Sequence, residues 1–119
     1  DKNDYLLFEF DSESDILKLK PNFFEMLKWN QAVIMATAQG ENCDFVSRVF
    51  APKIGINEDP VTGSAHTRLI PYWSNKLRKK VLNAQQLSKR AGVLKCQHLG
   101  NRVEITGQAV MFLKGVIFC

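Results

Sequence analysis

The sequence lacks the signatures of several large protein classes. No apolar run approaches the ~18 residues that a membrane-spanning helix needs. The N-terminal stretch DKNDYLLFEF does not combine a basic segment with an apolar one, as a secretory signal does. The three cysteines, Cys43, Cys96 and Cys119, are far apart and form no CxxC pair, which argues against a disulfide framework and a zinc site. We therefore expect no membrane span and a reducing, cytoplasmic setting.

Several catalytic motifs are absent as well. There is no GxSxG elbow and no P-loop pattern GxxxxGK[ST], because Gly63 is followed by Ser-Ala-His without a lysine. Ser64 and His66 are two residues apart, so on a helix they face different directions and cannot form a nucleophile–base pair. Neither His66 nor His98 has a partner at metal-ligand spacing, so we predict no metal site. A catalytic thiol stays open, although three buried or incidental thiols are the preferred interpretation.

Positive charge exceeds negative charge, with a net charge of +4. Much of the excess lies in KLRKK (Lys76 to Lys80) and SKR (Ser88 to Arg90), which permits a nucleic-acid-binding interpretation. No aromatic residue lies between Lys76 and Arg90 to stack on bases. Cations in the last turn of a helix also complement its dipole. We prefer a solvated helix end and keep a weak nucleic-acid binder as an alternative.

The amino-acid composition is typical of one globular domain. The 45% hydrophobic and 24% charged fractions are ordinary, and 119 residues can bury a core. Apolar runs bounded by turn residues predict about seven strands. These runs are DYLLFEFD, QAVIMATAQ, DFVSRVFAP, VLNAQQL, VLKCQHL, RVEIT and AVMFLKGVIF. Ser12 and Asn22 are typical N-caps of short helices. We predict a single α+β domain over residues 1–119.

One longer helix is predicted from about Ser64 to Lys79. Its apolar residues recur every four positions, at Ala65, Leu69, Trp73 and Leu77. This spacing lines one face of a helix, and we expect the sheet to curl around it and bury that face. Pro71 cannot donate a hydrogen bond to the carbonyl of Thr67, so we expect a kink or a loosened turn there.

The stretch EDPVTGSAH (Glu58 to His66) places a carboxylate beside the predicted start of this helix. The first N–H groups of a helix have no internal partners and the dipole makes that end positive, so an anion can dock there. Gly63 would permit close approach, and Thr62 or Ser64 could cap the helix or lend a hydroxyl. Asp59 becomes a candidate proton carrier, since a neighbouring anion favours its protonated form. Plain helix capping without a ligand is the alternative.

The longer segment SRVFAPKIGINEDPVTGSAH (Ser47 to His66) resembles the signature of the phenazine-biosynthesis PhzF-like family, which shares the diaminopimelate-epimerase fold. Family members read Ser-Arg-x-Phe-Ala-Pro and then Gly-x-x-Glu-Asp-Pro-x-Thr-Gly-Ser-Ala. The matching residues are Ser47, Arg48, Phe50, Ala51, Pro52, Gly55, Glu58, Asp59, Pro60, Thr62, Gly63, Ser64 and Ala65. The resemblance continues through PYW (71–73), Gln86, Ser88, Arg90 and ITGQAV (105–110). Ala91 departs from it, because the family usually has a glycine there.

The resemblance implies a fold. PhzF-like proteins have two similar halves, each a barrel-like, mostly antiparallel sheet around a central helix, with the active site in the cleft between them. This chain resembles the C-terminal half only, so we expect a fragment or the product of a truncated gene. The family's principal acid/base glutamate and a Gly-His-Ala-Thr segment belong to the other half.

The resemblance also implies an activity. The parent protein would be a cofactor-independent isomerase or epimerase that transfers a proton on a small carboxylate-bearing substrate, without pyridoxal phosphate or metal. Asp59 would be the catalytic acid or base, and Thr62, Gly63 and Ser64 would bind the substrate. The isolated chain would be inactive without its N-terminal half or a second subunit. A stand-alone binding module, or a homodimer, is the alternative.

Overall fold

The computed structural model describes residues 4–119. Seven strands form one sheet in the order β1-β2-β3-β5-β6-β7, and β4 pairs with β3 off this path. β1 is parallel to β2 and β3 is parallel to β5, while the other pairs are antiparallel. The strands are β1 (Tyr5–Glu9), β2 (Val33–Gln39), β3 (Phe45–Ala51), β4 (Ile56–Asp59), β5 (Val81–Gln86), β6 (Gly92–His98) and β7 (Val103–Thr106). The α+β class is confirmed.

The helices are α1 (Glu13–Lys18), α2 (Phe23–Met26) and α3 (Gly63–Leu77), with a 3-10 turn at Pro52–Ile54. Both predicted N-caps of the short helices are confirmed. The Ser12 hydroxyl accepts the N–H of Asp15 at 3.2 Å, and the Asn22 side chain accepts the N–H of Glu25 at 3.1 Å. None of the helices within residues 4–119 has the length and apolar character to cross a membrane.

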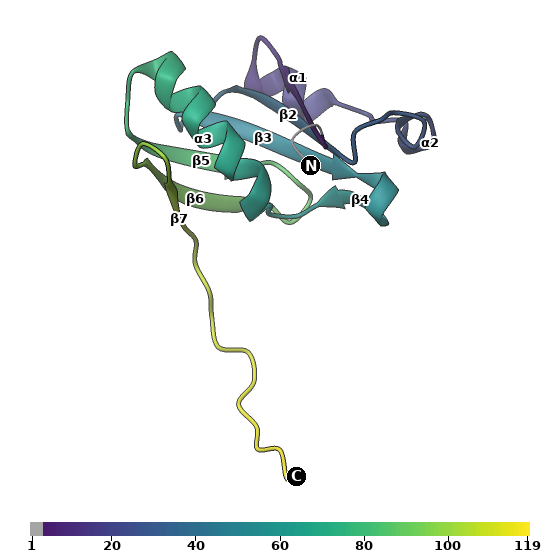
Figure 1. Ribbon diagram of the computed structural model, residues 1–119, viewed down its shortest axis with the longest axis vertical. Helices are drawn as coiled ribbons and strands as arrows, with labels where there is room; N and C mark the ends of the chain where they lie inside the picture. The colour runs from purple at the N-terminus through teal and green to yellow at the C-terminus, as the bar shows by residue number, and fades with distance from the viewer. Residues whose placement is uncertain (1–3) are drawn as a thin grey trace.

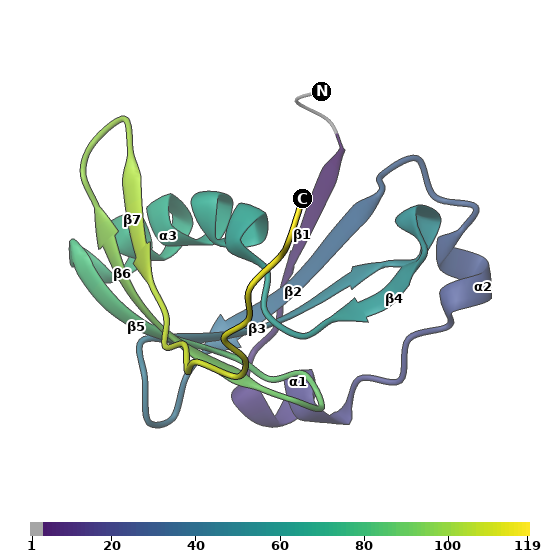
Figure 2. The ribbon, with the colours of Figure 1, turned by 90° about the horizontal axis from the view of Figure 1, so that it is seen from below.

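The principal helix α3 lies on the concave side of the curved sheet (Figure 2). Its residues Leu69 and Trp73 are fully buried, and Leu77 packs against the same core. The Trp73 ring stacks on Phe45, and its indole N–H donates to the Thr37 hydroxyl at 2.9 Å. Burial of a side chain of this size contributes roughly 2–3 kcal/mol. The predicted inward face is therefore confirmed.

Pro71 does not interrupt α3, which continues to Leu77. The kink or loosened turn predicted at Pro71 does not end the helix. Thr67, whose carbonyl loses its helical partner at Pro71, is exposed, so water can hydrate that carbonyl. A second core covers the opposite face of the sheet, where α1 and α2 bury Ile16 and Met26 against β2 and β3.

One strand was missed and one predicted strand was wrong. β4 is not among the seven predicted runs, yet Asp59 pairs with Val49 across the sheet. The run AVMFLKGVIF was expected to be a strand, but residues 107–119 form an extended tail that leaves the sheet after Thr106 (Figure 1). A strand needs a neighbour, and this tail pairs with nothing among the described residues.

Candidate functional site

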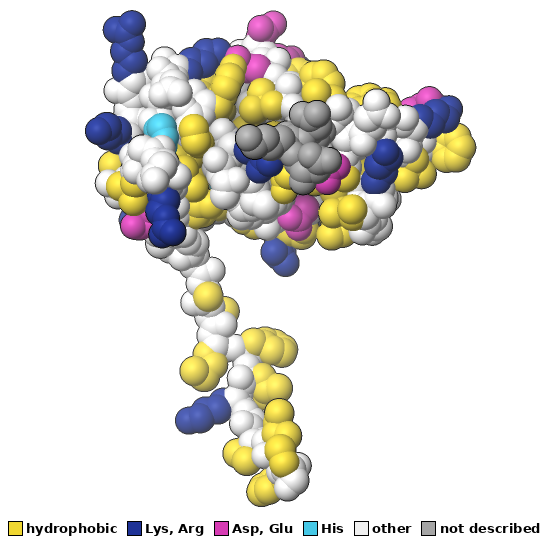
Figure 3. Space-filling model, in the orientation of Figure 1, with side chains coloured by type: hydrophobic (Ala, Val, Ile, Leu, Met, Phe, Trp, Pro, Cys, Tyr) yellow, Lys and Arg dark blue, Asp and Glu magenta, His cyan; other side chains and the backbone are white. Residues whose placement is uncertain are grey.

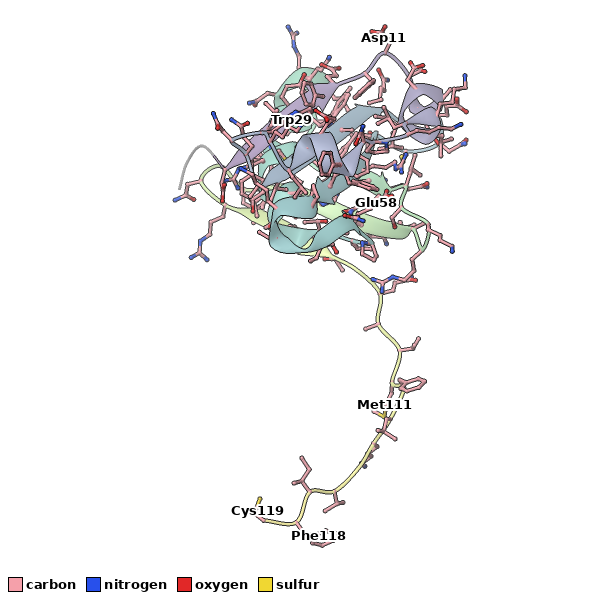
Figure 4. All side chains as sticks on the ribbon, turned by 90° about the vertical axis from the view of Figure 1, so that its right-hand side faces the viewer. Asp11, Trp29, Glu58, Met111, Phe118 and Cys119 are labelled. Carbon is pink, nitrogen blue, oxygen red and sulfur yellow. The ribbon has the colours of Figure 1, made fainter. Side chains whose placement is uncertain are left out.

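The end of β4 carries the candidate acid or base. Asp59 is the last residue of β4 and is half-buried, and the preceding Glu58 (Figure 4) is held by Arg48 of β3. A turn of three residues then leads into α3. The hydroxyl of Ser88, two residues beyond the end of β5, donates to the carbonyl of Pro60 at 2.8 Å. The residues on both sides of Asp59 are therefore held by hydrogen bonds.

Asp59, Thr62 and Gln86 form one connected hydrogen-bond network. The Thr62 hydroxyl donates to Asp59 Oδ2 at 2.5 Å. Gln86 Oε1 accepts the N–H of Thr62 at 2.8 Å. Gln86 Nε2 donates to the Asp59 carbonyl at 2.7 Å and to Thr62 Oγ1 at 3.0 Å. The structure thus brings the predicted residues Asp59 and Thr62 into direct contact.

The N-terminus of α3 is open. Thr62 is its N-cap residue, but the Thr62 side chain makes no capping hydrogen bond. Gly63 and Ser64 are exposed, and a Cβ built on Gly63 would meet nothing within 4 Å. Among residues 4–119 no acceptor bonds the N–H groups of Gly63 and Ser64. Free N–H groups at the positive end of a helix are suited to a carboxylate or a phosphate.

Sequence reasoning named four site residues but missed the group that joins them. Asp59 and Thr62 are half-buried in one network, while Gly63 and Ser64 stand beside it at the surface. Gln86 was noted only as part of a resemblance. The sequence does carry a signal for Gln86, because it lies two and four residues after Ala84 and Leu82, the buried residues on the same face of β5. A buried amide at such a position must find partners, and here they are Asp59 and Thr62.

The histidine of the motif is enclosed in the core. His66 is fully buried, and its Nδ1 donates to the Thr62 carbonyl at 2.7 Å. Burial lowers the pKa of His66, and the hydrogen bond to Thr62 opposes this in part. Ser64 is exposed, so the expectation that the two side chains do not face each other is confirmed.

The cysteines offer little for nucleophilic chemistry. Burial raises the pKa of Cys96 to about 11, so its thiol stays protonated at neutral pH. Burial first, and then the charges of Glu13 and Asp44, raise the pKa of Cys43. Cys119 lies at the exposed end of the tail. Within residues 4–119, no group of three or more His, Cys, Asp or Glu side chains is placed to hold a metal ion.

The basic cluster is partly neutralised. Lys76 contacts Glu9, and Lys79 donates to both carboxylate oxygens of Asp44, at 2.7 and 3.0 Å. The hydrogen bond to Glu9 raises the pKa of Lys76. Paired cations release fewer counterions on contact with phosphates, so this arrangement argues against the nucleic-acid interpretation.

Two hollows lie near or opposite the site. A hollow of about 450 Å³ lies beside the Asp59 turn, lined by Glu58, Pro60, Ser88, Lys89 and Arg90. An apolar groove of about 320 Å³ lies between α2 and the sheet, with Phe8, Met26 and Trp29 in its lining. Neither lining includes Asp59, Thr62 or Gln86. The hollow beside Pro60 is the nearer of the two to the Asp59 network in sequence, because Glu58 and Pro60 flank Asp59.

Comparison with known proteins gives one consistent result. The family model for phenazine biosynthesis-like proteins, PhzC-PhzF, matches residues 2–115. An uncharacterized isomerase of Pseudomonas aeruginosa is 46% identical over 114 residues, covering 96% of this chain. A phenazine biosynthesis-like domain-containing protein 1 of Mus musculus is 55% identical over 75 residues, covering 62% of this chain and 26% of its own length. These relatives share the motif-bearing part of the chain.

A solved structure shares the fold. A phenazine biosynthesis PhzC/PhzF protein from Clostridium difficile superposes with a TM-score of 0.88 at 45% identity, over 97% of this chain and 45% of its own. The match to the Pseudomonas isomerase covers 44% of that protein. The chain therefore spans less than half the length of these relatives.

Proposed function

The chain belongs to the phenazine biosynthesis-like (PhzC/PhzF) family, and on that premise we propose that it supplies one half of an isomerase acting on a small carboxylate-bearing substrate. Curated relatives are named isomerases, which supports the reaction class. The observation that carries the proposal is the contact between Thr62 and Asp59 at 2.5 Å, directly beside the open start of α3.

In this proposal the substrate carboxylate binds the N–H groups of Gly63 and Ser64, and the Ser64 hydroxyl adds a donor. Asp59 takes the proton from the carbon next to the carboxylate, so the C–H bond breaks and its electron pair moves toward the carboxylate oxygens. The helix N-terminus stabilises the negative charge that develops there. The Thr62 hydroxyl donates to the Asp59 carboxylate and so fixes its orientation beside the helix start.

The proton must then reach a different carbon or the opposite face of the same carbon. A second acid or base is needed for this, and we propose that an N-terminal half or a second subunit supplies it. The curved sheet around α3 would then be one barrel-like half of a diaminopimelate epimerase-like protein, with the Asp59 turn facing the cleft. The chemistry would need no cofactor and no metal, and its location would be cytoplasmic.

A second candidate is a binding or dimerisation module. The observation that favours it is the tail, whose apolar side chains are 78% to 98% exposed at Val110, Met111, Phe112, Leu113, Val116, Ile117 and Phe118. Exposed apolar patches of this kind mark interaction sites. Both candidates need a partner surface, but only the isomerase also needs Asp59.

The test compares proton transfer with and without the Asp59 carboxylate. The chain, joined to its complementary half, is incubated in D₂O with a panel of small α-amino and α-hydroxy carboxylates, and loss of the C–H signal is followed by ¹H NMR. Asp59→Asn should reduce the rate on the order of 10²- to 10⁴-fold, the usual contribution of one positioned acid or base. Asp11→Asn, at an exposed bend, is the matched control and should keep full activity.

Stability separates this proposal from plain helix capping. If Asp59 only shapes the turn, Asp59→Asn should change the free energy of unfolding by about 1 kcal/mol and leave the rate unchanged. Full activity of the Asp59→Asn protein would end the isomerase assignment for this site. Measurable exchange by the 119-residue chain alone would contradict the need for a second half.

A further inference from the structure

We propose that Gln86 is a positioning residue for the Asp59 site: its amide fixes the direction of the Thr62 hydroxyl, turning this N-cap residue away from α3 and toward Asp59. A role for Gln86 in catalysis rests on the proposed function, whereas its hydrogen-bond geometry is independent of that function. Gln86 is fully buried, at the end of β5 opposite Ser47 of β3. No solvent competes for its hydrogen bonds.

The orientation of the Gln86 amide follows from its partners. The Thr62 backbone N–H can only donate, so the Gln86 atom 2.8 Å away is the carbonyl oxygen. The Asp59 carbonyl can only accept, so the Gln86 atom 2.7 Å away is the NH₂ nitrogen. Both contacts require the same amide orientation, and the reversed amide would place two acceptors and two donors against each other.

The direction of the Thr62 hydroxyl follows in turn. The Gln86 NH₂ group lies 3.0 Å from Thr62 Oγ1 and has no acceptor capacity, so it donates to that oxygen. The hydroxyl hydrogen is then free for Asp59 Oδ2, 2.5 Å away, which accepts it. The order of donation is Gln86 to Thr62 to Asp59. A chain of hydrogen bonds in one direction strengthens each member.

Because the Thr62 hydroxyl points to Asp59, it does not cap α3, and this leaves N–H groups at the helix start for a ligand. In α1 the hydroxyl of Ser12 accepts the N–H of Asp15 and so caps the helix. Thr62 occupies the same position in α3, yet its hydroxyl is engaged by Gln86 and Asp59 and makes no cap. The N–H groups at the start of α3 are thus kept for an incoming anion. Gln86 controls both the Asp59 contact and the open helix start.

The first experiment measures the hydroxyl directly. In the wild-type chain, a slowly exchanging Thr62 hydroxyl proton should be visible by NMR, with a nuclear Overhauser contact to the Asp59 side chain. Gln86→Met keeps the length of the side chain but removes its donor and acceptor, so the hydroxyl signal should be lost to rapid exchange. Gln85→Met changes the neighbouring glutamine, which is outside the Asp59–Thr62 network, and should keep the signal.

The second measurement uses acetate as the probe. Acetate should shift the amide signals of Gly63 and Ser64 in the wild-type chain. In Gln86→Met the released Thr62 hydroxyl can turn back and cap α3, so acetate should bind about tenfold more weakly, the size of one lost hydrogen bond. The affinity of Gln85→Met should equal that of the wild type.

A second variant keeps the inference testable where Gln86→Met does not fold. Gln86→Glu retains the acceptor for the Thr62 N–H. Its protonated form can also donate to Thr62, whereas its ionised form cannot. The Thr62 hydroxyl signal of Gln86→Glu should therefore match that of the wild type at low pH and exchange faster than the wild type at higher pH. Such reversal with pH is not expected of a residue that only fills space.

The outcomes separate the two proposals. If the wild-type chain shows no acetate shift at Gly63 and Ser64, the anion site of the proposed function fails, whatever Gln86 does. If acetate binds and the Thr62 hydroxyl signal of Gln86→Met and of Gln86→Glu equals that of the wild type at every pH, the role of Gln86 is overturned while the anion site stands. Loss of the signal in Gln85→Met as well would also overturn the assignment to Gln86.

Discussion

The guanidinium of Arg48 holds the Glu58 carboxylate through two parallel hydrogen bonds, Nε to Oε1 at 2.7 Å and Nη2 to Oε2 at 2.9 Å. Its remaining nitrogen, Nη1, donates to the carbonyls of Ile16 and Leu19 at 3.1 and 2.9 Å, at the end of α1. The Arg48 side chain thus connects β4, which carries Asp59, to α1, which lies on the face of the sheet away from α3. The planar fork of arginine is suited to this double task.

The first prediction concerns this ion pair. Glu58→Gln should lower the free energy of unfolding by about 2 kcal/mol, because the Arg48 side chain, only 13% exposed, keeps a charge without its counter-charge. Urea unfolding of the two proteins measures the difference. Glu25→Gln is the control: Glu25 and Lys28 are 52% and 61% exposed, and loss of such a pair costs less than about 1 kcal/mol. Equal losses in both variants would contradict a special role for the Arg48 contact.

Local signals in the sequence were enough for several elements. Ser12 and Asn22 cap helices as expected because a cap bonds a residue three positions away. β4 could not be found in this way, since its apolar content is low and its partner β3 is the evidence for it. The strand predicted in the tail was wrong for a different reason. AVMFLKGVIF has strand propensity, but the described residues give it no neighbouring strand.

The second prediction concerns Ala91. Its φ of 56° lies in the left-handed region, where a Cβ is unfavourable, and its N–H is bonded to Ser88. Ala91→Gly should therefore stabilise the protein by about 1 kcal/mol, after the entropy that glycine gains in the unfolded chain is subtracted. Thermal unfolding measures this gain.

Gly92→Ala is the matched control for Ala91→Gly. A Cβ on Gly92 would lie 2.3 Å from Val61 Cγ2, in the turn that carries the site, so this change should destabilise the protein. Equal effects of the two changes would show that the left-handed φ of Ala91 is not the cause of strain.

The third prediction concerns the tail, residues 107–119, whose apolar side chains lie along an extended chain away from the sheet (Figures 3 and 4). A stop after Thr106 should reduce self-association, because it removes the exposed side chains of Phe112 and Phe118. Sedimentation velocity over a range of protein concentrations measures the change. Lys114→Ser, which keeps the apolar residues, is the control and should associate like the wild type. A wild-type chain that stays monomeric at millimolar concentration would contradict this prediction.

Some residues of the candidate site are close in the sequence and others come together only through the fold. Asp59, Thr62, Gly63 and Ser64 lie within six residues of each other, so a motif could place them at one helix start. Gln86 follows Thr62 by 24 residues, and only the register of β5 beside β3 brings it to the network. Sequence periodicity could mark Gln86 as inward-facing, but it could not name the groups that satisfy the amide.

The last prediction concerns pH and His66. Burial holds the pKa of His66 in the folded protein below its ordinary value of 6.5. Between these two values the unfolded chain binds a proton that the folded protein does not, so stability falls as the pH falls below about 6.5. The slope from this one residue is at most about 1.4 kcal/mol per pH unit. Above pH 6.5 both states are neutral at His66, and its contribution to stability is fully present.

The measurement is urea unfolding of three proteins between pH 5 and pH 8. His66→Phe keeps an aromatic ring beside Phe45 but cannot be protonated, so its stability should change less than that of the wild type as the pH falls. His98→Gln should keep the wild-type slope, because His66 is still present. Carboxylates contribute equally to all three proteins and cancel in the differences. A wild-type slope identical to that of His66→Phe would show that the buried imidazole does not couple protonation to unfolding.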